Sequence, residues 1–433
     1  MWSGEVEVSS VHPVGFSGSV TEIASGVAFV PSFANVSAFA TEAGLVFVDT
    51  GSSIFATKIH AEIRKWSQDL LHTAIYSHGH IDHVFGVATF EREAEERGWP
   101  KPVVVAHEGV PRRFDRYVRT AGYNAVINQR QFGLAQLEWP VKYRYPDRTY
   151  SDRLDVEIGG VAFELHHANG ETDDHTWTWV PERRVLCCGD LFIWASPNAG
   201  NPQKVQRYPS EWAAALRRMA SLDAEFLLPG HGFPVVGRER VRLALTETAE
   251  MLESLVAQTL ELMNSGATLD EVIHSVTSPA HLLDRPYLAP VYDEPEFVVR
   301  NIWRLYGGWY DGDPSSLKPA PRASLAAEIA GLVGGAAVLA RRAKALAGSG
   351  ASDASDAAGD DGGFTNELRL AGHLAELALL ADPDDPAVRL AHSEVFEIMA
   401  ATATSTMARG IYSSAASHTS SARPQDSSAR PQG

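Results

Sequence analysis

The sequence predicts an α/β protein, in which a layered αββα body is followed by an all-α region. Short β-branched and aromatic runs, separated by turn-forming residues, fill residues 20–50, which is typical of an antiparallel meander. Strand-like and helix-like segments then alternate to about residue 240, which favours helices packed on paired sheets. Beyond residue 238 apolar residues recur at helical spacing, which predicts helices alone. We therefore expect one domain over 15–240 and a second domain over 241–412.

The first half of the αββα body combines strands with helices in a regular order. A helix is expected at about 54–68, a strand at 72–77, a helix from near Asp82 to about Arg97, and a buried strand at 102–106. The residues just before Asp82 therefore form a strand-to-helix loop.

The second half of the body begins with an aromatic-rich segment. Residues 107–150 have few clean periodic runs, and we interpret them as a lid. We then expect a hairpin at 153–168, two strands around a Pro-Glu turn at 175–190, a helix at about 209–221 and a strand at 225–232.

The all-α region is expected to contain two segments without a packed core. Helices are predicted over 239–266, 295–312, 321–347 and 364–380. A run of Gly, Ser and Asp predicts a flexible loop at 348–363, because such residues cannot bury a core. For the same reason we expect 413–433, where Ser-Ala-Arg-Pro-Gln occurs twice, to be a disordered tail.

Composition excludes several classes of partner and location. The chain has 37 basic and 54 acidic residues, and its net charge of −17 argues against nucleic acid, whose binding depends on clustered cations. The only two cysteines, Cys187 and Cys188, are adjacent and fit two buried residues on a strand in a reducing compartment. The N-terminus lacks the pattern of a signal peptide, and no stretch is long enough to span a bilayer. We therefore expect a cytoplasmic protein with no membrane span.

The stretch "YSHGHIDHVFG" places His78, His80, Asp82 and His83 within six positions. Histidines two residues apart in an extended loop project to one side, whereas the Asp-His pair enters the helix and points back from another direction. One loop can thus offer ligands to two adjacent metal ions, and imidazole with carboxylate suits zinc.

Four further positions accompany this loop. "HHANGETDD" contains Glu171, "VLCCGD" ends at Asp190, "LLPGHG" contains His231, and "VFVDTG" contains Asp49. Together with the histidine loop, these segments resemble the metallo-β-lactamase superfamily, whose signature is H-x-H-x-D-H. The resemblance implies an αββα metallo-β-lactamase sandwich as the catalytic domain.

The resemblance also implies a ligand set for two zinc ions per chain. His78, His80 and Glu171 would hold the first ion, while Asp82, His83 and His231 would hold the second. Asp190 would bridge them, and Asp49 would orient a ligand rather than bind metal. If Glu171 is instead a surface carboxylate, His167 or His175 supplies the missing ligand.

The implied chemistry is hydrolysis by a hydroxide held between the two metal ions. In this scheme Asp82 and Asp190 are the catalytic carboxylates, and Asp190 keeps the hydroxide oriented.

Glu171 in place of the commoner histidine, and the helical segments around "RNIWRLYGGWYDGDPSSLKP", resemble the alkylsulfatase branch with its dimerisation domain. This resemblance implies a homodimer that hydrolyses sulfate esters of alkyl alcohols, which are small, anionic and amphipathic substrates. The alternatives are a metallo-hydrolase of carboxylic esters, lactones or thioesters, and a scaffold dimer without catalysis.

Side chains after Asp190, together with aromatic residues and a histidine from the preceding segment, are candidates for contacts in the site, with a structural alternative for each. The polar candidates are Asn198, Asn201, Lys204 and Arg207. Lys204 and Arg207 would suit an anionic head group, and the alternative is that they lie on a solvated loop. Several aromatic residues form either a slot for an alkyl chain or part of the core: Trp194, Phe192, Tyr123 and Phe132. His107 is either a proton donor or a structural histidine.

Overall fold

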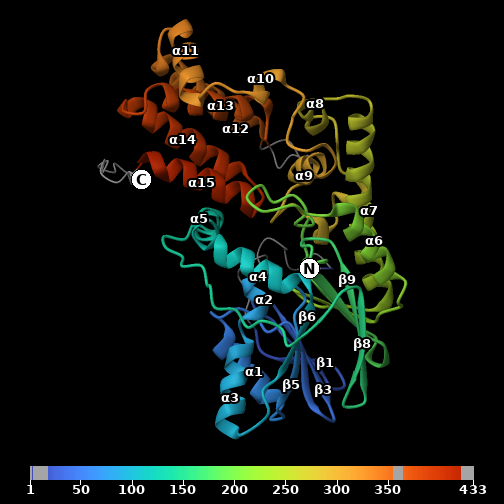
Figure 1. The fold of residues 1–433 in the computed structure, drawn as a ribbon. Coiled ribbons are helices and arrows are strands. Elements are labelled where there is room, and N and C mark those ends of the chain that lie inside the picture. Colours follow the sequence, from blue (N-terminus) through green and yellow to red (C-terminus); the bar gives the residue numbers. More distant parts are fainter. Residues whose placement is uncertain (1, 3–17, 355–363, 421–433) are drawn as a thin grey trace. The chain divides into compact units, whose positions relative to one another are not determined.

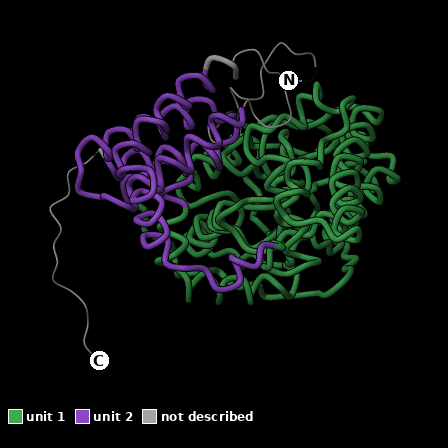
Figure 2. The backbone as a smooth tube through the Cα atoms, turned by 90° about the horizontal axis from the view of Figure 1, so that it is seen from above, with its two compact units in different colours: residues 1–127, 137–312 green, residues 128–136, 313–433 purple. Residues whose placement is uncertain are grey.

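A computed structural model of the chain describes residues 2, 18–354 and 364–420. The chain divides into two compact units (Figure 2), each of which is described by itself. Unit 1 comprises residues 1–127 and 137–312, and unit 2 comprises residues 128–136 and 313–433.

Unit 1 is built on two mixed β-sheets (Figure 1). The first sheet has its strands in chain order: β1 (Thr21–Ala24), β2 (Val27–Val30), β3 (Val36–Thr41), β4 (Gly44–Val48), β5 (Leu71–Ile75), β6 (Val103–His107) and β7 (Arg148–Tyr150). Strands β1 to β4 form the predicted antiparallel meander, and β4 to β7 run parallel.

The second sheet has the order β13-β12-β11-β10-β9-β8. Its strands are β8 (Arg153–Ile158), β9 (Val161–Ala168), β10 (His175–Val180), β11 (Val185–Gly189), β12 (Phe226–Pro229) and β13 (Val235–Val236). The predicted hairpin is β8 and β9, and the Pro-Glu turn between β10 and β11 is a short 3-10 helix, Pro181–Arg183. Only β11 and β12 pair in parallel within this sheet.

Alternation along the strands divides the core of unit 1 into three apolar layers. Side chains of both sheets, among them Val46 and Cys187, pack together between the sheets. Their neighbours in sequence face the other way, so that Phe47 joins the layer under one set of helices and Cys188 joins the layer under the other set. Successive strand residues point to opposite faces, so each sheet has two apolar faces. The inner faces pack against each other, and the outer face of each sheet therefore needs a layer of helices. The αββα prediction is confirmed.

Helices cover the outer face of each sheet. The layer on the first sheet includes side chains of α1 (Ala56–Trp66), α3 (Val87–Arg97) and α4 (Gly109–Arg119). The layer on the second sheet includes α6 (Pro209–Ala220) and α7 (Arg238–Asn264). The expected helix from Asp82 is divided into α2 (Ile81–Val84) and α3 at Gly86, where an added Cβ would lie 1.7 Å from the carbonyl oxygen of Thr50.

The aromatic-rich segment after β6 is more regular than predicted. It contains α4 and α5 (Ala121–Phe132) before a stretch without helix or strand. The apolar side chains of α4, including Val110 and Phe114, are buried under the first sheet, so this part of the segment is core rather than lid.

The domain boundary predicted at 240/241 differs from the division of the structure, which falls after Gly312. Helix α7 packs along α6, and Leu245 and Leu252 lie in the same core cluster as Trp212. The same unit contains α8 (Leu269–Ile273), two 3-10 helices (Ala280–Leu282 and Pro286–Leu288) and α9 (Pro295–Gly307). Helical periodicity marks where the strands end, but packing decides which unit a helix joins.

Unit 2 is helical in its described part, as predicted. It contains α10 (Pro314–Leu317), α11 (Arg322–Val333), α12 (Ala336–Ala354), α13 (Asn366–Ala381), α14 (Pro386–Thr402) and α15 (Thr406–Ser420). Helices α12 to α15 share an apolar cluster that includes Leu346, Leu368, Phe396 and Ala416.

Two predictions for unit 2 need correction. Helix α12 continues to Ala354, so 348–354 is not a loop, and α15 covers 413–420, which was expected to be disordered. Ala416 is buried against α14, and this contact makes an Ala- and Ser-rich segment helical. The remaining parts of both predicted segments, 355–363 and 421–433, lie outside the described residues.

Within the described residues no single helix has the length and apolarity needed to cross a membrane. The bent pair α11 and α12 passes the same test of length and composition together, across an angle of 89°.

Candidate metal centre

The seven predicted ligands converge at the ends of four strands of unit 1. Loops and the short helix α2 follow β5, β9, β11 and β12, and these connections bear His78, His80, Asp82, His83, Glu171, Asp190 and His231. Connections at strand ends place side chains from distant parts of the chain side by side while the sheets hold their backbones. The ligand atoms form two groups, each lying within 4.8 Å: His78, His80, Glu171 and Asp190 in one, and Asp82, His83 and His231 in the other.

The first group surrounds a point between two imidazoles and a carboxylate. Glu171 Oε2 lies 3.5 Å from His78 Nε2 and 3.5 Å from His80 Nδ1. The two ring nitrogens are 2.7 Å apart. His78 and Glu171 are buried, so bulk water does not solvate these atoms.

The second group has the same dimensions. Asp82 Oδ2 lies 3.5 Å from His83 Nε2 and 3.4 Å from His231 Nε2. Asp190 lies between the groups: its Oδ2 is 3.3 Å from His231 Nε2 and 3.8 Å from His78 Nε2, and its Oδ1 is 3.5 Å from His83 Nε2. This is the position expected of a bridging carboxylate.

Most of these separations, 3.3–3.5 Å, fit ligands around metal ions, whereas the 2.7 Å between His78 Nε2 and His80 Nδ1 is a hydrogen-bond distance. Donor atoms at about 2.0–2.1 Å from a tetrahedral zinc ion lie about 3.4 Å from one another, which is longer than a good hydrogen bond. Among the described residues, His83 Nε2, Glu171 Oε2 and Asp190 Oδ1 are buried without a hydrogen-bond partner. Buried polar atoms normally have partners, and a cation at the centre of each group would supply them. The donor set therefore fits two zinc ions.

Electrostatics favour a cation at this site. Burial raises the pKa of Glu171 to about 7, against the effect of the neighbouring Arg207. Burial lowers the pKa of His231, but the carboxylates of Asp190 and Asp82 outweigh it and raise that pKa to about 9. The carboxylates thus attract positive charge, which a proton or a metal ion can provide.

In the first group the imidazoles are neutral ligands. Burial lowers the pKa of both His78 and His80 well below the ordinary value. Ser77 Oγ donates its proton to Asp49 Oδ2 and therefore accepts a hydrogen bond from His78 Nδ1, 3.0 Å away. The lone pair of His78 Nε2 is thereby directed at the metal position.

Asp49, which the sequence predicts to orient a ligand, contacts the histidine loop through both of its oxygens. Its Oδ2 accepts from His83 Nδ1 at 2.8 Å, and its Oδ1 accepts from the backbone N–H of Ser77 at 2.7 Å. It adopts a φ of 60°, in the left-handed region that few residues other than glycine occupy, at a point where the carboxylate must turn back toward the histidine loop. Similarly, His231 Nδ1 donates to the carbonyl of Phe33, so that Nε2 faces the site.

Gly230 leaves room for the second group. A Cβ at this position would lie 2.2 Å from Asp190 Oδ1 and 2.9 Å from His83 Cε1. Any other residue before His231 would displace a ligand, which explains the Gly-His order in this turn.

Sequence reasoning missed a buried ion pair that supports the histidine loop. Arg113 of α4 donates through Nε to Asp174 Oδ2 at 2.8 Å, and the same oxygen accepts from the backbone N–H of Gly79 at 3.1 Å. Asp174 and Arg113 are buried, and Gly79 lies between His78 and His80. One partner lies on α4 and the other in the turn after Glu171, and no motif or spacing in the sequence predicts that they pair.

The predicted substrate contacts divide between the first group of ligands and the core. Arg207 donates to the carbonyl of Glu171 and lies 3.4 Å from Glu171 Oε1, and Asn198 Nδ2 also donates to Oε1. Arg207 Nε is buried with no partner among the described residues. Asn201 is buried in the same loop, where its backbone N–H donates to Asp293.

Lys204 is half-buried, and the charged side chains of the site influence its pKa. Burial and the nearby Arg207 lower the pKa of its ammonium to about 7, while the carboxylates of Glu171 and Asp82 oppose this shift. Its Nζ lies 5.9 Å from the ring centre of Trp139.

Trp194, predicted as a substrate contact, has its side chain in the core of unit 1, which is the alternative that the sequence left open. It is 3% exposed, its Nε1 donates to the carbonyl of Phe233 at 2.7 Å, and Phe192 packs against it. Trp194 thereby supports the turn that carries His231. Tyr123 lies at the surface, 62% exposed.

The other histidines near the site have structural partners. His107 accepts from the backbone N–H of Gly109, and its ring stacks on that of His167 with centres 3.7 Å apart. His175 Nε2 accepts from the backbone N–H of Asp190 at 3.1 Å, so His175 supports the backbone of that candidate ligand. Since Glu171 completes the first group, neither His167 nor His175 is needed as its substitute.

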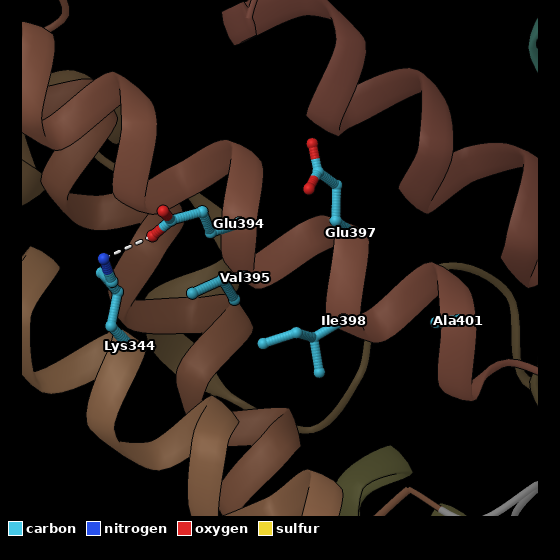
Figure 3. Close-up of a pocket in the computed structure, with 6 residues that line it drawn as sticks. All are labelled: Lys344, Glu394, Val395, Glu397, Ile398 and Ala401. Atoms are coloured by element: carbon cyan, nitrogen blue, oxygen red, sulfur yellow. Dashed lines mark ion pairs between the residues drawn. The ribbon is translucent and has the colours of Figure 1, made fainter.

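A hollow away from the candidate ligands lies in unit 2. It has a volume of about 530 Å³ and is lined by residues of α12 and α14, with an ion pair between Lys344 and Glu394 (Figure 3). None of the seven candidate ligands lines it.

An αββα body with two groups of His and carboxylate side chains at the ends of its strands defines the class of protein as one with a candidate metal centre. Sequence comparison agrees with this class. The metallo-beta-lactamase superfamily matches residues 30–231, and the family described as alkyl sulfatase dimerisation matches residues 268–421. The chain therefore combines a domain of the metallo-β-lactamase superfamily with an alkylsulfatase dimerisation domain.

Individual relatives place it more closely. It is 30% identical over 368 residues to a linear primary-alkylsulfatase of a Pseudomonas species, an alignment that covers 80% of this chain and 66% of the relative. It is 26% identical over 330 residues to an alkyl/aryl-sulfatase of Saccharomyces cerevisiae, covering 69% of this chain and 50% of the relative. The chain thus spans between half and about two thirds of the length of these relatives.

The fold is also that of a solved relative. The structure of a stereoselective inverting sec-alkylsulfatase from a Pseudomonas species superimposes with a TM-score of 0.79 and 23% identity, covering 94% of this chain and 66% of that one. The sandwich and the helices that follow it therefore share one fold with that protein.

Proposed function

We propose that the chain is a dinuclear-zinc hydrolase of alkyl sulfate esters. The observation that carries this proposal is the buried Arg207, which lies against the ligand Glu171 and has an unpaired Nε. The alkylsulfatases among its relatives support the same reaction class.

The chain's own residues have distinct roles in this proposal. His78, His80 and Glu171 would hold one zinc ion, Asp82, His83 and His231 the other, and Asp190 both. Two bound zinc ions would supply a hydroxide nucleophile near neutral pH and polarise the ester. Asp190 would orient the attacking water, and Asp82 would stabilise the same arrangement from the second group.

The cations beside the first group suit the charge of the substrate. A sulfate ester carries one negative charge, and an arginine N–H with no other partner is a directional donor to an oxyanion. Lys204 adds a second charge whose pKa would rise again beside an anion. Both groups are partly or fully buried, which strengthens their attraction for an anion relative to water.

The test is release of inorganic sulfate from a panel of alkyl sulfates of increasing chain length by the purified, zinc-loaded chain. We expect release that depends on zinc and on chain length. No release from any member, with zinc bound, would reject the sulfate ester as substrate. Matched carboxylic esters of the same alcohols serve as controls.

One observation favours a second candidate, a hydrolase of carboxylic esters, lactones or thioesters. The guanidinium of Arg207 is already engaged with both the carbonyl and the carboxylate of Glu171, so part of its charge is offset before any substrate binds. A neutral ester would then need no anion site. Turnover of lactones or thioesters, with sulfate esters untouched, would decide for this candidate.

A scaffold dimer without catalysis would require a decayed metal centre. Every one of the seven ligand positions carries a metal-competent side chain in a consistent geometry, which argues against decay. Metal analysis discriminates: fewer than about one zinc per chain after gentle purification, with no activity on reconstitution, would support the scaffold.

A further inference from the structure

The loop 196–207 is held in place by two buried polar side chains from a later part of unit 1. Asn301 lies on α9 and is 4% exposed, and Asp293 lies just before α9 and is fully buried. Both residues fall within the segment that matches the dimerisation family, residues 268–421. The same segment thus contributes side chains to the surroundings of the candidate metal centre.

Asn301 binds the backbone of Arg207 at two points. Its Nδ2 donates to the carbonyl of Arg207 at 3.1 Å, and its Oδ1 accepts from the backbone N–H of Arg207 at 3.3 Å. A side-chain amide has a donor and an acceptor side by side, so it can pair with both the N–H and the C=O of one residue, as a neighbouring strand would. The position of the Arg207 backbone is therefore set by α9.

Asp293 holds the middle of the same loop. Its Oδ2 accepts from the backbone N–H of Gly200 at 2.6 Å and from that of Asn201 at 3.0 Å. The approach of loop and helix is close, because a Cβ on Gly200 would lie 2.2 Å from the carbonyl carbon of Phe297. No residue other than glycine fits at this crossing.

The two parts of the loop that Asn301 and Asp293 bind both lie next to residues that contact one candidate metal ligand, Glu171. The guanidinium of Arg207 contacts the carbonyl and Oε1 of Glu171, and Asn198, two residues before Gly200, donates to the same Oε1. These contacts leave Oε2 facing His78 and His80. The rotamer of Glu171 is thus defined by two side chains whose backbones depend on Asp293 and Asn301.

We propose that Asn301 and Asp293 are positioning residues for the first metal site, acting through loop 196–207 on Glu171. The inference rests on the proposed metal centre, but it does not depend on which ester is hydrolysed. It assigns part of the dimerisation segment to the construction of the active unit as well as to assembly.

The test measures zinc affinity of the full chain by competition with a chromogenic chelator. Asn301→Leu keeps the approximate side-chain volume and removes both hydrogen bonds to Arg207. We expect one of the two zinc ions to bind about 10- to 100-fold more weakly, which is the usual effect of losing a group that orients a ligand. The affinity of the other zinc ion should stay unchanged.

Two comparisons separate positioning from general destabilisation. Ile302→Ala removes a fully buried apolar neighbour on the same helix, and it should lower the unfolding temperature without changing either zinc affinity. Arg207→Met combined with Asn301→Leu should bind zinc as Arg207→Met alone does, because residues that act through one another are not additive. If Asn301→Leu fails to fold, the milder Asp293→Asn is measured in the same way, with a smaller loss at the same zinc ion expected.

Several outcomes would overturn the proposal. Unchanged affinity for both zinc ions in folded Asn301→Leu would do so, as would effects of Asn301→Leu and Arg207→Met that simply add. A wild-type chain that binds no zinc would reject the metal centre and this inference together. A chain that binds zinc but releases no sulfate would reject only the proposed substrate.

Discussion

Several candidate ligands have a partner that determines which nitrogen or oxygen faces the centre. His83 presents Nε2 to Asp82 and Asp190 because its Nδ1 donates to Asp49, and His231 presents Nε2 because its Nδ1 donates to a backbone carbonyl. Imidazole can present only one lone pair in its neutral form, so these partners select the tautomer that can bind metal. At the scale of residues, the orientation of these candidate ligands therefore depends on neighbouring side-chain and backbone groups.

Asp49→Asn tests this dependence. The amide cannot accept from Ser77 and His83 with both of its ends, so His83 loses its fixed tautomer, and we expect about 10- to 100-fold weaker binding of one zinc ion. Zinc affinity by chelator competition is the measurement. Asp115→Asn is the control, because it makes the same change in an exposed carboxylate that accepts from Tyr145. Equal affinities in both variants would contradict the assigned role.

At the scale of elements, helix α4 joins the metal loop to the Glu171 turn. Its Arg113 is paired with Asp174, and Asp174 also accepts from the backbone of the histidine loop. Removing one partner of a buried ion pair leaves an uncompensated charge, which costs more than the pair itself contributes.

Arg113→Met should therefore lower the free energy of unfolding by about 3–5 kcal/mol. Urea unfolding of the zinc-free chain measures it without interference from metal binding. On the same helix, Arg112 is exposed and lies 3.9 Å from Glu108, and Arg112→Met should change stability by less than about 1 kcal/mol. A loss of similar size in both variants would show that the buried pair has no special role.

The whole molecule gathers three carboxylates into a small, largely buried site. Asp82, Glu171 and Asp190 lie close enough for one pair of metal ions to contact all of them. Such a concentration of negative charge disfavours the folded state unless cations are present.

Removal of metal should consequently lower the unfolding temperature. Zinc at 100 times its dissociation constant stabilises the folded state by about 2.7 kcal/mol per site, so treatment with a chelator should remove stabilisation of that order for each site. Thermal unfolding before and after chelation measures the change, and re-addition of zinc should reverse it. An unfolding temperature that does not respond to chelation would contradict the metal centre.

Assembly belongs to the same scale. The match to the dimerisation family and the apolar side chains that α11 exposes, with Leu332 at 79% and Leu325 at 52%, support a homodimer in which α11 contacts a second copy. We expect light scattering to give twice the chain mass of 46.9 kDa at micromolar concentration, and Leu332→Glu to shift it toward the single-chain value.

Ile54→Glu provides the control for assembly, since Ile54 is 82% exposed in unit 1. It should leave the mass unchanged. A wild-type monomer would contradict the dimer, and a dimer unaffected by Leu332→Glu would place the interface on another surface.

The sequence by itself determined the fold class, and it predicted which seven side chains gather as candidate ligands, with Asp49 beside them. These features depend on local patterns: alternation along strands, helical periodicity, and four ligands within six residues of one loop. They are readable because the residues that act together are close in sequence or stand at the ends of recognisable strands.

The tertiary structure alone decided which parts of the chain pack together. The boundary at residue 312, the core position of Trp194, the Arg113–Asp174 pair and the hold of Asn301 on Arg207 all involve residues that are far apart in sequence. An apolar helix face or a polar side chain has the same sequence pattern whichever partner it finds, and only the folded chain specifies that partner.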